Sequence, residues 1–358
     1  MNQYSNYKNG DDNSGLDVLV IGVGGGGNNS INRLSRIGVY GARTIAVNTD
    51  KEHLNNIQSD TKMLIGKDYN RGLGTGGDPD IGMRCAESAY GGFKKIIGDS
   101  DLVFITAGMG GGTGTGAIPV ISEIARDLGA LTVGVVTKPF PFELHKRKVQ
   151  AEEGIKKLKE KVDTLIVIPN ERLLQLADKK TSILDAFRMV DDVLHQGVQG
   201  ISDLITVPGI INLDFADVKT IMEGTGTALM GVGVSSEDNR AEDAANRAIT
   251  SPLLETTISG AQGILINITG GENLGLFEVH EAADIISSHA DSNANIIFGA
   301  VIDDSMNEEI RVTVIATGFD RKAGGHENVV EADFQKTNFD EDGDIDTPAF
   351  MRRKKEEE

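Results

Sequence analysis

Residues 101–116 read DLVFITAGMGGGTGTG, an apolar run that passes directly into a cluster of glycines and threonines. The apolar part favours a buried strand, and the residues after Thr113 favour a helix, so the glycines lie in the turn between them. Glycines in such a turn let backbone N–H groups approach phosphate oxygens closely, and the positive end of the following helix adds to the attraction. The segment therefore predicts a phosphate-binding loop.

A second loop of the same kind comes earlier in the chain. Gly22–Gly27 follows an apolar run at 16–21, satisfies the GxGxxG pattern and precedes a helix that we expect to begin near Asn28. Asp50 ends the next strand 23 residues after Gly27, where a dinucleotide fold places its ribose-binding acid. On this motif alone an oxidoreductase that binds a dinucleotide is a sound hypothesis, with an empty tight turn as the alternative.

The presence of two such loops favours a nucleoside triphosphate over a dinucleotide. A dinucleotide needs one loop for its pyrophosphate, whereas the charge of a triphosphate must be met from several sides. No GxxxxGK[ST] pattern occurs at either loop, so the lysine of P-loop enzymes is absent. Backbone amides, the hydroxyls of Thr113 and Thr115, and Mg²⁺ are expected to replace it. A third run, Gly72–Gly77, could close over the terminal phosphate, although alone it indicates only a flexible loop.

The apolar runs of the first half predict an α/β domain. They fall at 16–21, 44–47, 101–105, 131–136 and 164–168, with helical stretches between them. Continuous apolar strands that alternate with helices are typical of a parallel sheet covered on both faces. Residues 16–180 are therefore expected to form a Rossmann-like domain.

A long helix and a smaller α+β domain are expected to follow. Apolar residues recur every three or four positions over 182–205, so residues 181–206 form a candidate strut between two domains. Beyond it, strands and two amphipathic helices alternate within 207–318. The strands are expected at 228–234, 263–268, 296–301 and 310–315, and the helices near 240–250 and 276–289.

Both ends of the chain differ in composition from the rest. Residues 1–15 are polar and residues 319–345 hold few large apolar side chains, so we expect both to be disordered. Residues 346–358 contain a short apolar island, Pro348 to Met351, followed by bases. Such an island folds on a partner, but by composition alone an arbitrary tail is the simpler interpretation.

Charge and composition exclude several classes of protein. The chain has 358 residues with 35 basic and 54 acidic side chains, a net charge of −19, which repels nucleic acid phosphates. No apolar stretch approaches the length of a membrane span, the polar start lacks a signal sequence, and the single Cys85 forms no internal disulfide. We expect a cytoplasmic protein that binds no nucleic acid and does not insert into membranes. The segment His280–Asp284 lacks the second histidine of a zinc motif.

The segment Gly110–Gly116 is similar to the tubulin signature loop, and from about Leu16 to Phe319 the chain resembles the tubulin-like FtsZ family of cell-division GTPases. The resemblance implies a GTP-binding Rossmann-like domain, a long central helix, a smaller GTPase-activating α+β domain and a disordered acidic tail. It implies GTP and GDP as ligands with Mg²⁺, whose protein ligands it leaves open. It also implies head-to-tail filaments that form the division ring at mid-cell and recruit other division proteins.

The resemblance implies a nucleotide site built from several segments. Phe187 is expected to stack on guanine and Asp191 to accept hydrogen bonds from its N1–H and 2-amino groups, an acceptor that adenine would leave unpaired. By spacing alone, Phe187 indicates a core position and Asp191 a solvated acid. The full set of implied contacts is Gly25, Gly26, Gly27, Asn28, Asn29, Gly112, Thr113, Gly114 and Thr115 for the phosphates, Glu143 and Arg147 for ribose and phosphate, and Asn170, Phe187 and Asp191 for guanine.

Hydrolysis is expected to involve a second segment, after the long helix. The resemblance implies that Asn212, Asp214 and Asp217 form a synergy loop that enters the nucleotide site of the adjacent subunit. Such acids repel a triphosphate unless they orient the attacking water or help to hold a cation. By itself, Asp217 indicates a helix N-cap. A filament that binds nucleotide without hydrolysing it is the alternative.

Two departures from the family pattern and one further partner complete the predictions. Leu144 stands where the family usually has glycine, and Asp78 where it usually has asparagine. The segment Asp346–Arg353 resembles the peptide through which the family binds membrane adaptors. A partner of the FtsA, ZipA or SepF kind is therefore implied.

Overall fold

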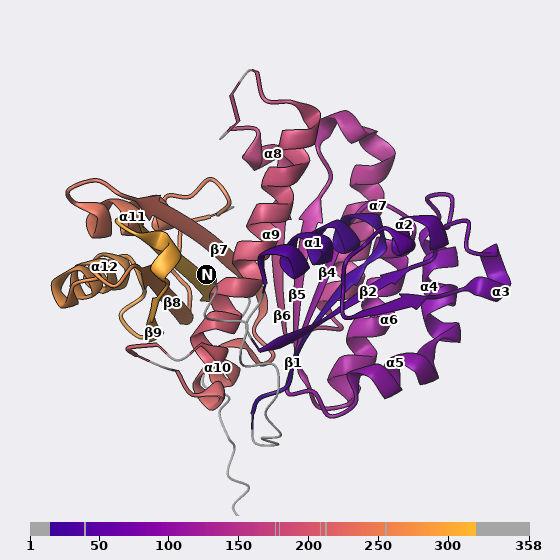
Figure 1. The fold of residues 1–358 in the computed structure, drawn as a ribbon, viewed down its shortest axis with the longest axis horizontal. Helices are drawn as coiled ribbons and strands as arrows, with labels where there is room; N and C mark the ends of the chain where they lie inside the picture. The colour runs from indigo at the N-terminus through magenta and orange to yellow at the C-terminus, as the bar shows by residue number, and fades with distance from the viewer. Residues whose placement is uncertain are drawn as a thin grey trace, which may run out of the picture. The chain divides into compact units, whose positions relative to one another are not determined.

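The computed structural model describes residues 15–319, except 39–40, 176, 179, 208, 212 and 255. The predictions for residues 1–14, for Asn212 and for the tail from 320 to 358 lie outside the described residues. One ten-stranded sheet runs through the described chain in the order β3-β2-β1-β4-β5-β6-β7-β10-β8-β9 (Figure 1).

The first six strands are parallel, as the apolar runs predict, and helices cover both faces. Strand β3 was not predicted, because it has four residues at the sheet edge and none of them is fully buried. The strands of this part are β1 Val18–Val23, β2 Ala42–Asn48, β3 Thr61–Leu64, β4 Leu102–Gly108, β5 Leu131–Lys138 and β6 Thr164–Pro169. The helices are α1 Gly24–Ile37, α2 Lys51–Asn55, α3 Lys67–Asn70, α4 Pro79–Ser88, α5 Tyr90–Ile97, α6 Thr113–Asp127, the 3₁₀ turn η2 Pro141–Glu143, α7 Leu144–Lys159 and α8 Asn170–Leu173.

The second half contains the predicted long helix and a mixed sheet. Its elements are α9 Ile183–Thr206, α10 Phe215–Met222, β7 Gly226–Ser235, α11 Arg240–Ile249, β8 Gly263–Gly270, α12 Leu276–Ser288, β9 Asn295–Ile302, η3 Asp304–Met306 and β10 Ile310–Thr317. Strand β7 belongs to both halves, because its start pairs in parallel with β6 and its remainder pairs antiparallel with β10. The two parts therefore share one continuous sheet.

Helix α9 packs against both parts of this sheet. Its buried residues Val190, Leu194 and Val198 belong to the same apolar cluster as Val135 of β5 and Ile315 of β10. Two glycines of α9 allow the close approach. A Cβ at Gly197 would lie 3.1 Å from the sulfur of Met230, and one at Gly200 would lie 3.0 Å from a methyl group of Thr313. The strut is thus a core helix along much of its length.

Two local predictions are wrong. Helix α1 begins at Gly24, directly after β1, and not near Asn28, so the glycines of the first loop form the first turn of the helix itself. The N-cap of α10 is Asp214, whose side chain accepts from the backbone N–H of Ala216, and Asp217 lies in the first turn. An acid at either position suits the positive end of a helix, so spacing could not separate the two.

A buried carboxyl marks the contact between α9 and the C-terminal strands. Burial raises the pKa of Asp203 to about 7, and the nearby charge of Asp303 adds to the shift, while Gln199 and Arg311 oppose it. Asp203 is 9% exposed. The carboxyl therefore destabilises the fold when it is ionised.

Asp203→Asn should change how stability depends on pH. The native pKa lies above the ordinary value of 3.8, so the native state holds more protons than the unfolded state between about pH 4 and 7, and the free energy of unfolding falls as pH rises through that window. The wild type loses on the order of 2–4 kcal/mol of unfolding free energy in this way. The variant does not, because its amide stays neutral. Thermal unfolding should be measured at pH 5 and pH 8. The Tm of the variant relative to that of the wild type should be higher at pH 8 than at pH 5. The exposed control Glu281→Gln should show no such trend.

Candidate functional site

The two glycine loops lie against each other at the ends of β1 and β4. A Cβ added at Gly24 would lie 2.8 Å from the backbone nitrogen of Gly114, and one at Gly26 would lie 3.1 Å from the Cα of Gly108. Real Cβ atoms are essentially never found closer than about 3 Å to such atoms, so any side chain would push the loops apart. The two predicted phosphate loops therefore form one cradle.

The inner surface of the cradle has the features of an anion site. The N-terminal ends of α1 and α6 meet there, and each presents backbone N–H groups and a positive helix end. A Cβ at Gly25 or Gly111 would meet nothing within 4 Å, so the space beside these residues is open. Asn28 is fully buried, yet neither polar atom of its side chain has a hydrogen-bond partner within the described chain. A buried amide in that state is suited to a bound ligand.

Threonine side chains brace the cradle from inside. The Thr113 hydroxyl lies 2.6 Å from that of Thr49, at the end of β2, and 3.5 Å from that of Thr75 in the third glycine run. The Thr115 hydroxyl accepts from the N–H of Gly110 at 2.8 Å, so it holds the loop in shape. Thr75 belongs to the third glycine run that the sequence indicated, whereas Thr49 gave no signal there, because only the fold brings it to the signature loop.

The third glycine run is held in place within this structure. The N–H of Gly74 donates to the carbonyl of Thr49 at 3.1 Å, and the amide of Asn70 donates to the carbonyl of Gly74 at 3.0 Å. A Cβ at Gly112 would lie 2.1 Å from the Thr75 hydroxyl. The run therefore packs against the signature loop, next to the cradle.

Asp191 of α9 lies beside the first loop. Its carboxylate accepts from the Ser30 hydroxyl at 3.2 Å, which joins the long helix to α1. Burial raises the pKa of Asp191 to about 6, with the neighbouring Asp192 adding to the shift and the Ser30 hydrogen bond opposing it. A half-buried acceptor of this kind can select a ligand that presents two N–H donors. Ser30 is a site residue that no sequence motif indicates.

Phe187 sits one turn before Asp191, at the edge of an aromatic cluster. Its ring lies 5.4 Å from that of Phe140 and 6.3 Å from that of Phe142, in both cases nearly perpendicular, and Phe140 stacks on Phe142 at 4.9 Å. Phe187 is 39% exposed, so it is not the core residue that its spacing indicates. Its exposed face is free to stack on a planar base.

Glu143 and Arg147 form an ion pair at the start of α7. The Glu143 carboxylate also accepts from the N–H of Phe140 at 3.0 Å. A Cβ at Gly110 would lie 2.6 Å from the carbonyl oxygen of Arg147, so this turn packs against the signature loop. The fold thus brings both residues to the rim of the cradle.

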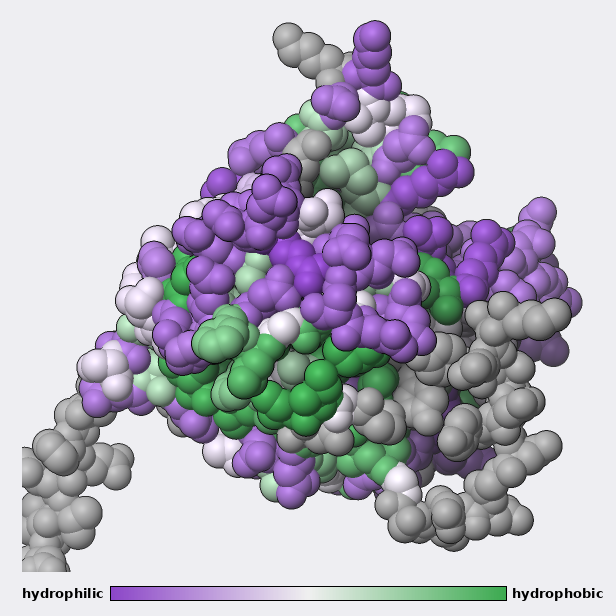
Figure 2. Space-filling view, turned by 60° about the vertical axis from the view of Figure 1, so that its left-hand side comes forward, coloured by the Kyte–Doolittle hydropathy of each residue, from purple (hydrophilic) through white to green (hydrophobic). Residues whose placement is uncertain are grey.

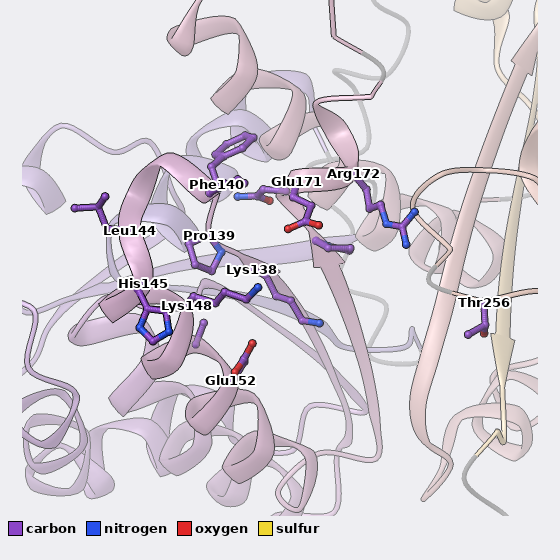
Figure 3. A pocket seen from close by; sticks show the side chains of 14 residues that line it. Lys138, Pro139, Phe140, Leu144, His145, Lys148, Glu152, Glu171, Arg172 and Thr256 are labelled. Carbon is purple, nitrogen blue, oxygen red and sulfur yellow. The ribbon is translucent and has the colours of Figure 1, made fainter.

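Asn170 lies in the wall of a separate hollow of about 660 Å³, between α7, the ends of β5 and β6, and the segment around Thr256 (Figure 3). The charged side chains Lys148, Glu152, Glu171 and Arg172 also line it. Asn170 is 3% exposed, and its side-chain oxygen has no partner in the part of the chain described. Phe140 lines the same hollow and packs edge-on against Phe187, so the hollow that holds Asn170 borders the aromatic cluster.

The predicted catalytic acids lie elsewhere. Asp214 and Asp217 are exposed at the start of α10, beyond the C-terminal end of α9, whereas Phe187 and Asp191 lie near its other end (Figure 1). The helix rises about 22 Å between Asp191 and Thr206. One subunit therefore does not bring its acids to its own cradle.

Two weaker sequence candidates have other roles. Asp50 caps α2 by accepting from the N–H of His53 at 3.0 Å. His280 pairs with Asp284 at 3.4 Å on the exposed face of α12.

Within the described ranges, no group of three or more histidine, cysteine or acidic residues is placed to hold a metal ion. Cys85 is buried, as expected. None of the helices in the described part of the chain has both the length and the apolar character that a membrane span requires.

Comparison with known proteins identifies the architecture. Residues 17–178 match the GTPase domain of the Tubulin/FtsZ family, and residues 226–320 match the C-terminal domain of the FtsZ family. The structure is similar to an empty FtsZ dimer from M. jannaschii at 46% identity, with a TM-score of 0.83 over 85% of this chain and 89% of that one. The chain belongs to the tubulin/FtsZ family.

A second M. jannaschii FtsZ structure, a point mutant, is similar at 47% identity, with a TM-score of 0.83 over 85% of this chain and 91% of that one. The GDP-bound CetZ1 monomer from Haloferax volcanii has 19% identity and a TM-score of 0.72 over 85% of this chain and 94% of that one, which shows a common fold. The predicted tubulin/FtsZ fold and family are therefore confirmed. The match to the GTPase domain implies that the chain binds GTP and GDP.

The crowding of the cradle gives a direct test of its geometry. Gly27→Ala should destabilise the protein by about 1–3 kcal/mol or more, because its Cβ would lie 2.3 Å from the carbonyl oxygen of Thr106. Gly25→Ala is the matched control in the same helical turn, where a Cβ has open space, and it should leave thermal unfolding unchanged or slightly improved. Equal losses of Tm in both variants would contradict the packing described here.

Proposed function

We propose that this FtsZ-like GTPase assembles head to tail, with GTP bound in the cradle and hydrolysed at each contact between subunits. The observation that carries the proposal is the separation of the cradle from Asp214 and Asp217 along α9. Because neither end of one subunit can complete the site alone, a second copy must supply the acids. A contact between unlike surfaces repeats indefinitely unless its rotation closes a ring, so the product is a filament.

The relatives support self-association. One similar structure is described as an FtsZ dimer, and another, CetZ2 from Haloferax volcanii at 20% identity, as a protofilament with GTPγS. In this chain, large apolar side chains are exposed at both ends of α9. Near the cradle these are Leu73 and Leu144; Ile210 lies shortly before Asp214, and Leu276 and Phe277 begin α12. Exposed apolar surface at two opposite ends suits a contact between successive copies.

Each part of the cradle has a role in binding GTP. The N–H groups of both loops, with Asn28 and Asn29, meet the phosphates, and Thr113 adds a hydroxyl. Phe187 stacks on guanine, and ionised Asp191 accepts from its N1–H and 2-amino groups. Glu143 and Arg147 hold the ribose side, and Asn170 borders the site from the neighbouring hollow. Mg²⁺ on the phosphates would supply neutralising charge, and it commonly keeps several waters there, so it needs no dense acidic cluster.

Hydrolysis depends on the neighbour's acids. Asp214 and Asp217 project from the start of α10 and carry no ion pair within the described residues. Next to another subunit's terminal phosphate, they orient the attacking water and accept its proton. Asn212 is the third member of this segment by resemblance. Hydrolysis is thereby coupled to assembly.

The shared site predicts that two inactive variants rescue each other. Asp214→Asn keeps the helix cap but removes the charge, so it should bind GTP and lose hydrolysis by roughly 10²-fold or more. Gly25→Glu fills open space in the cradle with a negative charge, so it should fold but lose nucleotide. Mixed together, the intact acids of the second variant act on the GTP of the first. Phosphate release by the mixture should far exceed the sum of its parts.

The control mixture pairs Asp214→Asn with the double variant Gly25→Glu, Asp214→Asn, which has no acid to offer and should give no rescue. Nucleotide affinity of monomeric Asp214→Asn should equal that of the wild type. Rescue by the double variant, or a wild-type rate per subunit that stays constant on dilution, would overturn the shared site. Assembly of the wild type without phosphate release would favour the non-hydrolysing polymer.

The wider role is proposed from the family. The filaments form the cytoplasmic division ring at mid-cell and recruit other division proteins. We propose domain limits at 16–180, 181–206 and 207–318, with a linker at 319–345 and a partner-binding peptide at 346–358. In that peptide, Phe350 and Met351 would enter a groove of a membrane adaptor of the FtsA, ZipA or SepF kind, each worth about 1.5–3 kcal/mol if fully buried.

Removal of residues 346–358 should separate attachment from assembly. The truncated protein is expected to keep its GTPase rate and its polymerisation, because none of the residues that form the cradle or α10 is removed. Recruitment of filaments to adaptor-coated vesicles should be lost, and Phe350→Ala should lose most of it. Cosedimentation with the vesicles measures this effect, and failure of the truncated protein to polymerise in solution would refute the adaptor role.

A further inference from the structure

Leu144 has a backbone conformation that leucine rarely adopts. Its φ is 75° and its ψ is 164°, in a region populated almost only by glycine. It is one of three non-glycine residues with positive φ among those described, with Arg71 and Asn307. The strain arises from the β-carbon, so a glycine would hold the same turn without it.

The Leu144 side chain is stabilised little by packing within its own subunit. It is 74% exposed, at the rim of the 660 Å³ hollow, and Figure 3 shows it directed away from the other labelled side chains. Strain in the backbone and an exposed apolar side chain are both unfavourable in a monomer. What the residue contributes must therefore come from outside the subunit.

The position of Leu144 indicates what covers it. It directly follows Glu143, at the rim of the cradle, and Phe142 beside it is half exposed. At the far end of the molecule, Ile211 forms a bridge with Ala300 of β9, and β8 pairs with β9 as far as Gly270 and Ile302. The ends of β8 and β9 therefore lie at the segment that leads into Asp214.

That far surface is apolar. Ile210 is 67% exposed there, and Leu276 and Phe277, at the start of α12 shortly after β8, are 79% and 84% exposed. Figure 2 shows apolar surface gathered on the face formed by the C-terminal elements. A subunit that presents Asp214 to its neighbour's cradle presents this surface with it.

We propose that Leu144 is a contact residue between successive subunits, packing against the apolar surface around Ile210, Leu276 and Phe277 of a second copy. The proposal rests on the head-to-tail assembly proposed above and adds to it a residue at which this chain departs from the usual glycine. The leucine stabilises the filament and destabilises the subunit. Its two effects are therefore separable by substitution.

Two variants of Leu144 and one control test the proposal. Leu144→Gly removes both the strain and the side chain, so the Tm of GDP-bound monomers should rise by about 2–4 °C while the critical concentration for assembly with GTP rises about ten-fold. Leu144→Ala keeps the β-carbon, so it should raise the critical concentration similarly and leave the Tm unchanged. Val149→Ala, at an exposed position further along α7, should change neither.

The outcomes distinguish this proposal from the one it rests on. If the wild type assembles but Leu144→Gly and Leu144→Ala keep its critical concentration, Leu144 is no contact and only this proposal fails. A lower Tm for Leu144→Gly would show that the backbone is not strained and would overturn it as well. If the wild type does not assemble with GTP, head-to-tail assembly and the Leu144 contact fail together.

Discussion

The site depends on the absence of side chains where the two glycine loops meet. The first turn of α1, the signature loop and the start of α4 approach so closely that a Cβ at Gly116 would lie 1.9 Å from the carbonyl of Pro79. This crowding fixes the N-terminal ends of α1 and α6 side by side, with their N–H groups around one space. The threonine contacts, the position of Asp191 and the third glycine run all follow from that arrangement.

Helix α9 links the two parts of the sheet and buries several titratable side chains between them. Burial shifts three of its titratable groups strongly, raising the pKa of Asp191 and Asp203 and lowering that of His195 to about 4. The Nε2 atom of His195 also lacks a hydrogen-bond partner in the described chain. A helix selected only for stability would place apolar side chains at such positions. The buried polar groups of α9 therefore cost folding stability.

The features that could be predicted from the sequence are local ones. Buried parallel strands, the long amphipathic helix and the glycine loops each leave a pattern within a few consecutive residues, and the structure has them all. The short edge strand β3 leaves no such pattern. Thr49, Ser30 and Phe140 belong to the site only because distant segments meet there, so no spacing could reveal them. At the start of α10 the pattern predicted a cap but not which acid provides it.

Strand β7 also joins two ladders of unequal length. It has three paired positions with β6, Thr164 to Ile166, but seven with β10. The shorter ladder supplies fewer hydrogen bonds across the seam between β6 and β7 than the ladder between β7 and β10 does. That seam therefore relies more on α9, which packs against both β5 and β10, than on strand pairing.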